Sequence, residues 1–128
     1  IPMAAQDFAA DGSLRPLSKL PFVPNSRNDR LQRCMNIFEM QVAGLKKRLQ
    51  VTGAKAVVGV SGGLDSTLAL LVAAQAMKEL GRPVTDLIGI TMPCFGTSDR
   101  TYRNSLTLMK NLGVSVREIN SYTGNLCR

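Results

Sequence analysis

The stretch that decides the fold is residues 56–67, which read Ala-Val-Val-Gly-Val-Ser-Gly-Gly-Leu-Asp-Ser-Thr. An apolar run of β type over residues 57–60 leads into a short Ser-Gly-Gly turn, and an apolar run of helical type begins at about Asp65. A chain that turns tightly from strand to helix leaves backbone N–H groups unpaired at the positive end of the helix dipole. The segment therefore predicts an anion-binding loop.

The residue types within this loop favour phosphate as the anion. Gly62 and Gly63 present no side chain that would keep phosphate from the backbone, and they permit positive φ. Ser61 and Ser66 add hydroxyl donors, whereas Asp65 fits only if a cation lies between its carboxylate and the phosphate, so we interpret it as a Mg²⁺ ligand. The alternative is a connection whose glycines serve only packing. The loop is not of the Walker type, because it lacks the lysine of G-x-x-x-x-G-K-[ST].

Beyond this loop, short apolar strands alternate with helices. We expect strands at 56–60, 86–92 and 114–119, and helices at 65–80 and 99–112, the latter capped by Ser98 or Asp99. This alternation predicts an α/β fold with a parallel, three-stranded βαβαβ sheet and right-handed crossovers. Ligands of such sheets bind at the carboxyl ends of the strands, so the 61–66 and 92–99 loops should converge at one edge.

The first half of the chain has a different pattern. Residues 1–26 show no periodicity and contain several prolines, which indicates a linker or an arm. A long amphipathic helix follows, capped by Asn28 or Asp29 and running to about Gln50. Its apolar positions have a 4-3-4-3-4 spacing and are Leu31, Met35, Phe38, Val42, Leu45 and Leu49. This stripe fits packing on the domain's own core, contact with a second subunit, or both.

The bulk composition narrows the class of protein. The chain has 128 residues, 45% of them hydrophobic, which suffices for one domain with a real core. The net charge of +7 is spread along the chain, and aromatic residues make up only 5%, so we expect no nucleic-acid binding. We expect no membrane span, because no run approaches about 20 uncharged apolar residues. Three cysteines at unsuitable spacings argue against a zinc site or a disulfide framework and favour a cytoplasmic protein.

Three segments together carry a family resemblance. Residues 61–66 resemble the S-G-G-x-D-S loop (PP-loop) of the N-type ATP pyrophosphatases. Residues 90–102, Ile-Thr-Met-Pro-Cys-Phe-Gly-Thr-Ser-Asp-Arg-Thr-Tyr, are similar to the stretch after the second strand in bacterial glutamine-dependent NAD⁺ synthetases. Residues 21–24, Pro-Phe-Val-Pro, and a helix ending at residues 44–49 resemble the linker that enters their synthetase domain. The resemblance implies an adenine-nucleotide alpha-hydrolase-like fold, with residues 27–128 as the N-terminal half of that domain and the chain as a fragment of a longer protein.

The resemblance also implies a nucleotide site. The residues expected to bind ATP or pyrophosphate are Gly59, Val60, Ser61, Gly62, Gly63, Leu64 (through its backbone), Asp65 and Ser66, with Asp65 also holding Mg²⁺. The residues expected near adenine or ribose are Thr91, Met92, Pro93 and Thr97. Core packing is the alternative for Met92, and Thr97, Asp99 and Arg100 have the alternative of capping a helix or carrying a solvated charge. No residue of the chain is expected to be catalytic.

The implied reaction is that of a ligase. The enzymes that the chain resembles convert deamido-NAD to NAD⁺ through an acyl-adenylate, with release of AMP and pyrophosphate. The ammonia comes from glutamine through a separate glutaminase domain, and we expect a homo-oligomer. The alternatives are another ATP pyrophosphatase, such as a GMP synthetase-like or tRNA-thiolating enzyme, or an ATP-binding fragment without turnover.

Overall fold

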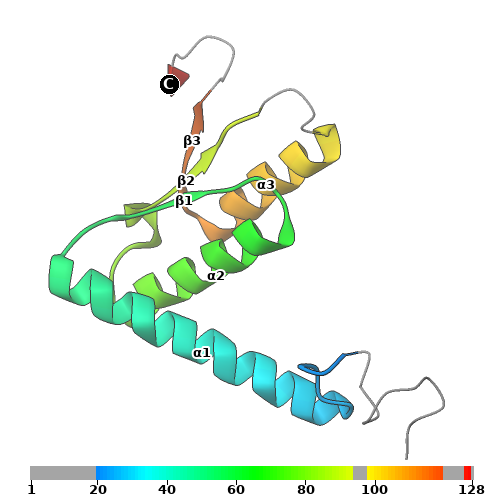
Figure 1. Ribbon diagram of the computed structural model, residues 1–128. Helices are drawn as coiled ribbons and strands as arrows, with labels where there is room; N and C mark the ends of the chain where they lie inside the picture. The colour runs from blue at the N-terminus through cyan, green and yellow to red at the C-terminus, as the bar shows by residue number, and fades with distance from the viewer. Residues whose placement is uncertain (1–19, 94–97, 120–125, 128) are drawn as a thin grey trace, which may run out of the picture. The chain divides into compact units, whose positions relative to one another are not determined.

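The structure is a computed structural model that describes residues 20–93, 98–119 and 126–127 (Figure 1). The chain divides into two compact units, Ile1–Asn36 and Ile37–Arg128. Helix α1 (Arg27–Thr52) begins in the first unit and ends in the second. Most of the predicted arm, and Thr97 of the predicted site, lie outside the described residues.

In the first unit, α1 is capped by Ser26 and not by the predicted Asn28 or Asp29. The Asp29 N–H donates to Ser26 Oγ at 3.4 Å, and the Arg30 N–H donates to the Ser26 carbonyl at 3.0 Å. The prediction was wrong because the Ser26 hydroxyl is already placed to reach the donors of the first turn. Asp29 lies inside that turn, where its carboxylate interacts favourably with the positive end of the helix dipole.

In the second unit, the sheet has the predicted parallel core. Strands β1 (Ala56–Gly59), β2 (Leu87–Thr91) and β3 (Ser115–Ile119) lie in the order β1-β2-β3 and pair in parallel. A short strand β4 (Leu126–Cys127) adds to β3 in antiparallel fashion. It was not predicted, because a two-residue strand is too short to leave an alternating pattern.

Helices α2 (Leu64–Glu79) and α3 (Asp99–Leu112) cover one face of this sheet (Figure 1). Burial alternates along β2, whose Leu87, Gly89 and Thr91 are buried beneath the helices. The opposite face carries Val57, which is 57% exposed, beside Ile88, its partner on β2. Among the described elements no helix covers that face. A short 3₁₀ helix, η1 (Val84–Asp86), precedes β2 and was not predicted.

The hydrophobic core lies between the sheet and the three helices α1, α2 and α3. Of the predicted stripe on α1, Val42 and Leu49 are buried in this core, and Phe38 and Leu45 pack against it. These four positions therefore pack on the domain's own core, as the first alternative proposed. Leu31 and Met35, which belong to the first unit, are 58% and 53% exposed.

Polar contacts secure the end of the sheet opposite the predicted site. Arg82 donates to the Ala54 carbonyl at 2.9 Å, and Asp86 pairs with Lys55 at 3.4 Å and with Arg82 at 3.7 Å. Since these groups precede β1 and β2, they fix the amino ends of both strands. Across the described ranges, no helix is long and apolar enough to cross a membrane.

Candidate functional site

The loop between β1 and α2 leaves the start of α2 open. Gly62 has a left-handed backbone with φ +87°, and Gly63 precedes the helix in an extended conformation with φ −83° and ψ 172°. No side chain within the described part of the chain caps the first turn. The first N–H groups of α2, from Leu64 to Ser66, therefore face outward without a side-chain acceptor.

Helix α3, in contrast to α2, has a side chain that caps its first turn. The Ser98 hydroxyl accepts the Thr101 N–H at 3.2 Å and contacts Thr101 Oγ1 at 2.6 Å. One of the two predicted caps, Ser98, is thus confirmed. The difference between the two helices indicates that α2 keeps its donors available for an anion, whereas α3 satisfies one of its donors internally.

Hydroxyl groups of the loop form a closed chain of hydrogen bonds. The Gly63 N–H donates to Ser61 Oγ at 3.4 Å, and Ser61 Oγ lies 3.1 Å from Ser66 Oγ. Ser66 and Thr67 both donate to the Gly63 carbonyl, at 3.2 and 2.8 Å. Because Ser66 donates its single hydrogen there, Ser61 must be the donor to Ser66. The Ser61 and Ser66 hydroxyls must therefore turn away from these partners before they can donate to phosphate.

The loop contacts the first turn of α3 at Gly62. A side-chain carbon at this position would overlap the Thr101 carbonyl oxygen and come within 2.8 Å of the Thr101 methyl group. Only glycine fits both this contact and the positive φ. The 61–66 loop thus contacts the first turn of α3. The predicted convergence was with the 92–99 loop, of which residues 94–97 lie outside the described residues.

A small cavity opens beside the loop at the carboxyl ends of β1 and β2. It has a volume of about 200 Å³ and is lined by Gly59, Val60, Ser61, Ile90 and Met92. Pockets for drug-sized ligands usually measure about 300–1,000 Å³, so this cavity suits one part of a nucleotide rather than the whole. Four of its five lining residues belong to the predicted site, and Ile90 is an addition.

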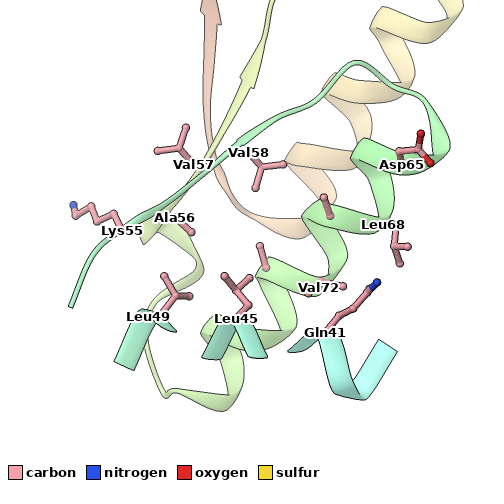
Figure 2. A pocket seen from close by; sticks show the side chains of 12 residues that line it. Gln41, Leu45, Leu49, Lys55, Ala56, Val57, Val58, Asp65, Leu68 and Val72 are labelled. Atoms are coloured by element: carbon pink, nitrogen blue, oxygen red, sulfur yellow. The ribbon is translucent and has the colours of Figure 1, made fainter. Parts of the chain in front are cut away.

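A larger groove of about 640 Å³ lies on the other side of the loop, between α1, β1 and α2 (Figure 2). Nine of its twelve lining residues are apolar, and its polar members are Gln41, Lys55 and Asp65. Asp65 borders this groove and not the small cavity. Its carboxylate is exposed and has no hydrogen-bond or ion-pair partner among the described residues. The same ranges contain no cluster of three or more acidic, cysteine or histidine side chains that could hold a metal ion.

The remaining predicted residues differ in how accessible they are. Thr91 is only 4% exposed, so its side chain cannot reach a ligand in the cavity. Met92 is 57% exposed and lines the cavity, so the alternative that it packs in the core is wrong. Asp99 and Arg100 are exposed in the first turn of α3.

A contact that the sequence did not predict joins α3 to β3. The Tyr102 hydroxyl donates to Glu118 Oε2 at 2.7 Å, and this bond raises the pKa of the Tyr102 phenol above its ordinary value of 10.0. Glu118 is paired with Thr91 in the sheet. Tyr102 ends the 90–102 segment that carries the family resemblance, but no role was predicted for it. Glu118 lies outside that segment, so only the alternating pattern of β3 could have placed it on the helix-covered face.

The family of the chain follows from comparison with known proteins. The family model described as NAD synthase matches residues 37–123. The chain belongs to the NAD synthase family. It is 47% identical over 109 residues to the glutamine-dependent NAD(+) synthetase of Mycobacterium leprae, covering 84% of this chain and 16% of that protein. It is 42% identical over 120 residues to the enzyme of the same name from Mycobacterium tuberculosis strain H37Rv, covering 88% and 18%. The chain thus spans less than a fifth of the length of these curated relatives.

Solved structures of NAD synthetases share this fold. The glutamine-dependent NAD+ synthetase from Acinetobacter baumannii, in complex with adenosine diphosphate, matches with a TM-score of 0.60 and 21% identity, covering 90% of this chain and 20% of that one. The NH3-dependent NAD synthetase from Campylobacter jejuni matches with a TM-score of 0.58 and 21% identity, covering 70% and 37%. The predicted fold class, a parallel βαβαβ core of the ATP pyrophosphatase type, is confirmed.

Proposed function

We propose that residues 27–128 form the N-terminal half of a synthetase domain that amidates deamido-NAD to NAD⁺ with ATP. The observation that carries the proposal is the uncapped start of α2, whose first N–H groups face outward next to two glycines. Such a helix start attracts anions through its free donors and its dipole. Membership of the NAD synthase family adds the substrate class.

The reaction proceeds in two steps. The nicotinate carboxylate attacks the α-phosphorus of ATP, the bond to the bridging oxygen breaks, and acyl-adenylate and pyrophosphate result. Ammonia then attacks the acyl carbon, loses a proton and displaces AMP. The main task of the protein is to hold the reactants in line and to stabilise charge on the leaving pyrophosphate.

In this proposal the 61–66 loop holds the pyrophosphate end of ATP. The backbone N–H groups of Leu64, Asp65 and Ser66 donate to the phosphate oxygens, and the Ser61 and Ser66 hydroxyls join them after leaving their mutual bond. Gly62 and Gly63 allow the phosphate to approach. Removal of one such donor in a site without water typically raises the barrier by about 2.7–4 kcal/mol.

We place adenine or ribose in the small cavity. Gly59, Val60 and Met92 line it, and the backbone of Thr91 and Pro93 at the end of β2 lies next along the chain. Thr97 completes the proposed set. From this cavity the triphosphate would cross the open start of α2 toward Asp65.

Asp65 suits Mg²⁺ because it offers, at the phosphate-binding turn, an exposed carboxylate that has no partner among the described residues. Mg²⁺ is commonly held by one or two carboxylates together with phosphate oxygens and waters, so a three-residue cluster is not needed. When bound, the ion would neutralise charge on the departing pyrophosphate. Asp65 would hold it on the groove side of the loop.

The remaining parts of the proposal concern the longer protein. A glutaminase domain would supply ammonia, in keeping with relatives named glutamine-dependent. We place the protein in the cytoplasm, as its cysteine usage favours, and we expect a homo-oligomer.

The test identifies ligand and products separately. Calorimetric titration of this chain with ATP and with pyrophosphate, each in the presence of Mg²⁺, should show binding that Gly63→Val abolishes by filling the approach to the loop. The longer enzyme, given ATP, deamido-NAD and ammonia or glutamine, should release NAD⁺, AMP and pyrophosphate. Release of ADP and phosphate would overturn the proposed chemistry, and amidation of xanthosine monophosphate would move the protein to the GMP synthetase-like alternative.

A further inference from the structure

The first turn of α3 is held between the anion-binding loop and the sheet. On one side, the Thr101 carbonyl and methyl group fill the space beside Gly62. On the other, the next residue, Tyr102, donates its hydroxyl to Glu118 on β3 at 2.7 Å. Two consecutive residues therefore connect the loop to a strand on the far side of β2.

The strand end of this connection is firmly fixed. Glu118 pairs with Thr91 of β2 on one side and with Cys127 of β4 on the other. Tyr102 is also held through its backbone, since its N–H donates to the Ser98 carbonyl at 3.0 Å and its carbonyl accepts from the buried Ser105 hydroxyl at 2.7 Å. Because the acceptor is a carboxylate, the phenol bond is of the stronger, charge-assisted kind.

The loop end of the connection has weak restraints of its own. Within the described part of the chain, the side-chain hydrogen bonds of the loop join Ser61, Gly63, Ser66 and Thr67 and all stay within residues 61–67. They fix the internal shape of the loop but not its direction relative to the sheet. The loop is anchored at its start by Val60, whose N–H donates to the Ile90 carbonyl of β2, and at its end by α2. Between these two anchors, the contact of Gly62 with Thr101 orients the loop relative to the sheet.

We propose that Tyr102 and Glu118 are positioning residues for the 61–66 loop. Their hydrogen bond sets the position of the Thr101 carbonyl, and that carbonyl sets how the loop presents its free N–H groups to the phosphates. The inference rests on the proposed function, because it takes the phosphates of ATP as the ligand of the loop. Displacement of a positioning group by about 1 Å costs as much as a hundredfold in rate.

Three variants and a matched control test the connection in this chain without any ligand. Tyr102→Phe keeps the ring and removes the donor, and Glu118→Leu removes the acceptor. Glu118→Gln keeps a carbonyl oxygen that can accept the Tyr102 hydroxyl, so the hydrogen bond should remain. The control, Ser115→Ala, also removes one side-chain hydrogen bond from β3, the 2.7 Å bond to the Thr85 carbonyl, but at the opposite end of the strand.

Amide hydrogen exchange should separate local positioning from general stability. We expect exchange at Thr67, whose N–H donates to the Gly63 carbonyl of the loop at 3.1 Å, to rise about tenfold in Tyr102→Phe and Glu118→Leu, while amides of the β1–β2 ladder keep their rates. Glu118→Gln should stay within about twofold of the wild type, and Ser115→Ala should leave the loop unchanged. Equal exchange at Thr67 in Tyr102→Phe and the wild type overturns the inference.

Calorimetric titration with ATP and Mg²⁺ gives the second measurement. Tyr102→Phe should weaken ATP binding about tenfold, whereas Glu118→Gln should bind ATP nearly as tightly as the wild type. If the wild type binds no ATP, the proposed function fails while the exchange experiment still decides the inference. If the wild type binds ATP and Tyr102→Phe binds it equally well, the inference fails and the proposed function stands.

Discussion

Gly89 of β2 lies directly against the sulfur of Met109 on α3. A side-chain carbon at position 89 would overlap that sulfur and lie 3.2 Å from Met109 Cγ and 3.5 Å from Val114 Cγ2. Met109 is fully buried, so it has little room to move aside. The absence of a side chain at position 89 therefore sets how closely α3 approaches the sheet.

Gly89→Ala should destabilise the chain by overpacking, by about 1–3 kcal/mol in free energy of unfolding. Urea unfolding measures this directly. Gly44→Ala is the matched control, because a side-chain carbon there meets nothing within 4 Å and the residue lies inside α1. It should stabilise the chain by about 0.5–1 kcal/mol. Unchanged stability in Gly89→Ala would show that Met109 yields without cost.

Gly62→Ala should impair both the fold and the anion site. The substitution places a side chain at φ +87° and against the Thr101 carbonyl. Gly81 separates the two effects, since it has φ +67° with open space around it. Gly81→Ala should cost about 1–2 kcal/mol through backbone strain alone and leave ATP binding intact. Gly62→Ala should cost more and abolish ATP binding in calorimetric titration; binding equal to that of Gly81→Ala would contradict this.

Asp65→Asn should weaken the Mg²⁺-dependent part of ATP binding selectively. The amide keeps the size of the side chain but loses the charge that holds the ion, so titrations with Mg²⁺ should show the loss and titrations without it should not. Asp29→Asn is the control, as Asp29 also lies in the first turn of a helix. Equal losses with and without Mg²⁺ would rule out a metal-ligand role for Asp65.

The contact between Lys46 and Glu79 should contribute to stability in a pH-dependent way. The Lys46 ammonium donates to Glu79 Oε2 at 3.1 Å and, together with Gln75, holds the pKa of Glu79 below its ordinary value of 4.5. A carboxyl whose pKa is lower in the folded state stabilises the fold above pH 4.5, and this is lost as the pH falls through the folded-state pKa. Thermal unfolding of Glu79→Gln should therefore depend less on pH in this acidic range than that of the wild type. A slope equal to that of the wild type would show that the contact is too solvated to matter.

Local signals predicted most of the fold. The predicted bounds of α3, 99–112, agree with the structure because both ends carry their own markers. Ser98 caps the start, and Gly113 takes the left-handed conformation with φ +72° just past the end. The parallel pairing of the three strands followed from the alternation of strands and helices, and the position of the anion-binding loop followed from its glycines. At the start of α1 the sequence prediction chose Asn28 or Asp29 and missed Ser26, because several short polar side chains that can cap a helix lie close together there.

Contacts between distant parts of the chain could not be predicted in the same way. The bond from Tyr102 to Glu118 joins residues 16 positions apart, and the contact of Gly62 with Thr101 depends on how α3 settles on the sheet. Burial was equally hard to foresee, since Met92 and Thr91 are neighbours in sequence yet one is exposed and the other buried. These features depend on tertiary packing, which no local pattern encodes.

The bare face of the sheet has a consequence for the chain in solution. Val57 is exposed there beside Ile88, and β1 is an edge strand with one row of backbone groups unpaired in the described sheet. An apolar edge strand is a ready template for pairing with another copy. The net charge of +7 makes copies of the chain repel one another. At 0.1 M salt this repulsion is largely screened between charges more than about 10 Å apart. Turbidity should therefore rise with added salt, and purification at low ionic strength should limit this edge-to-edge association.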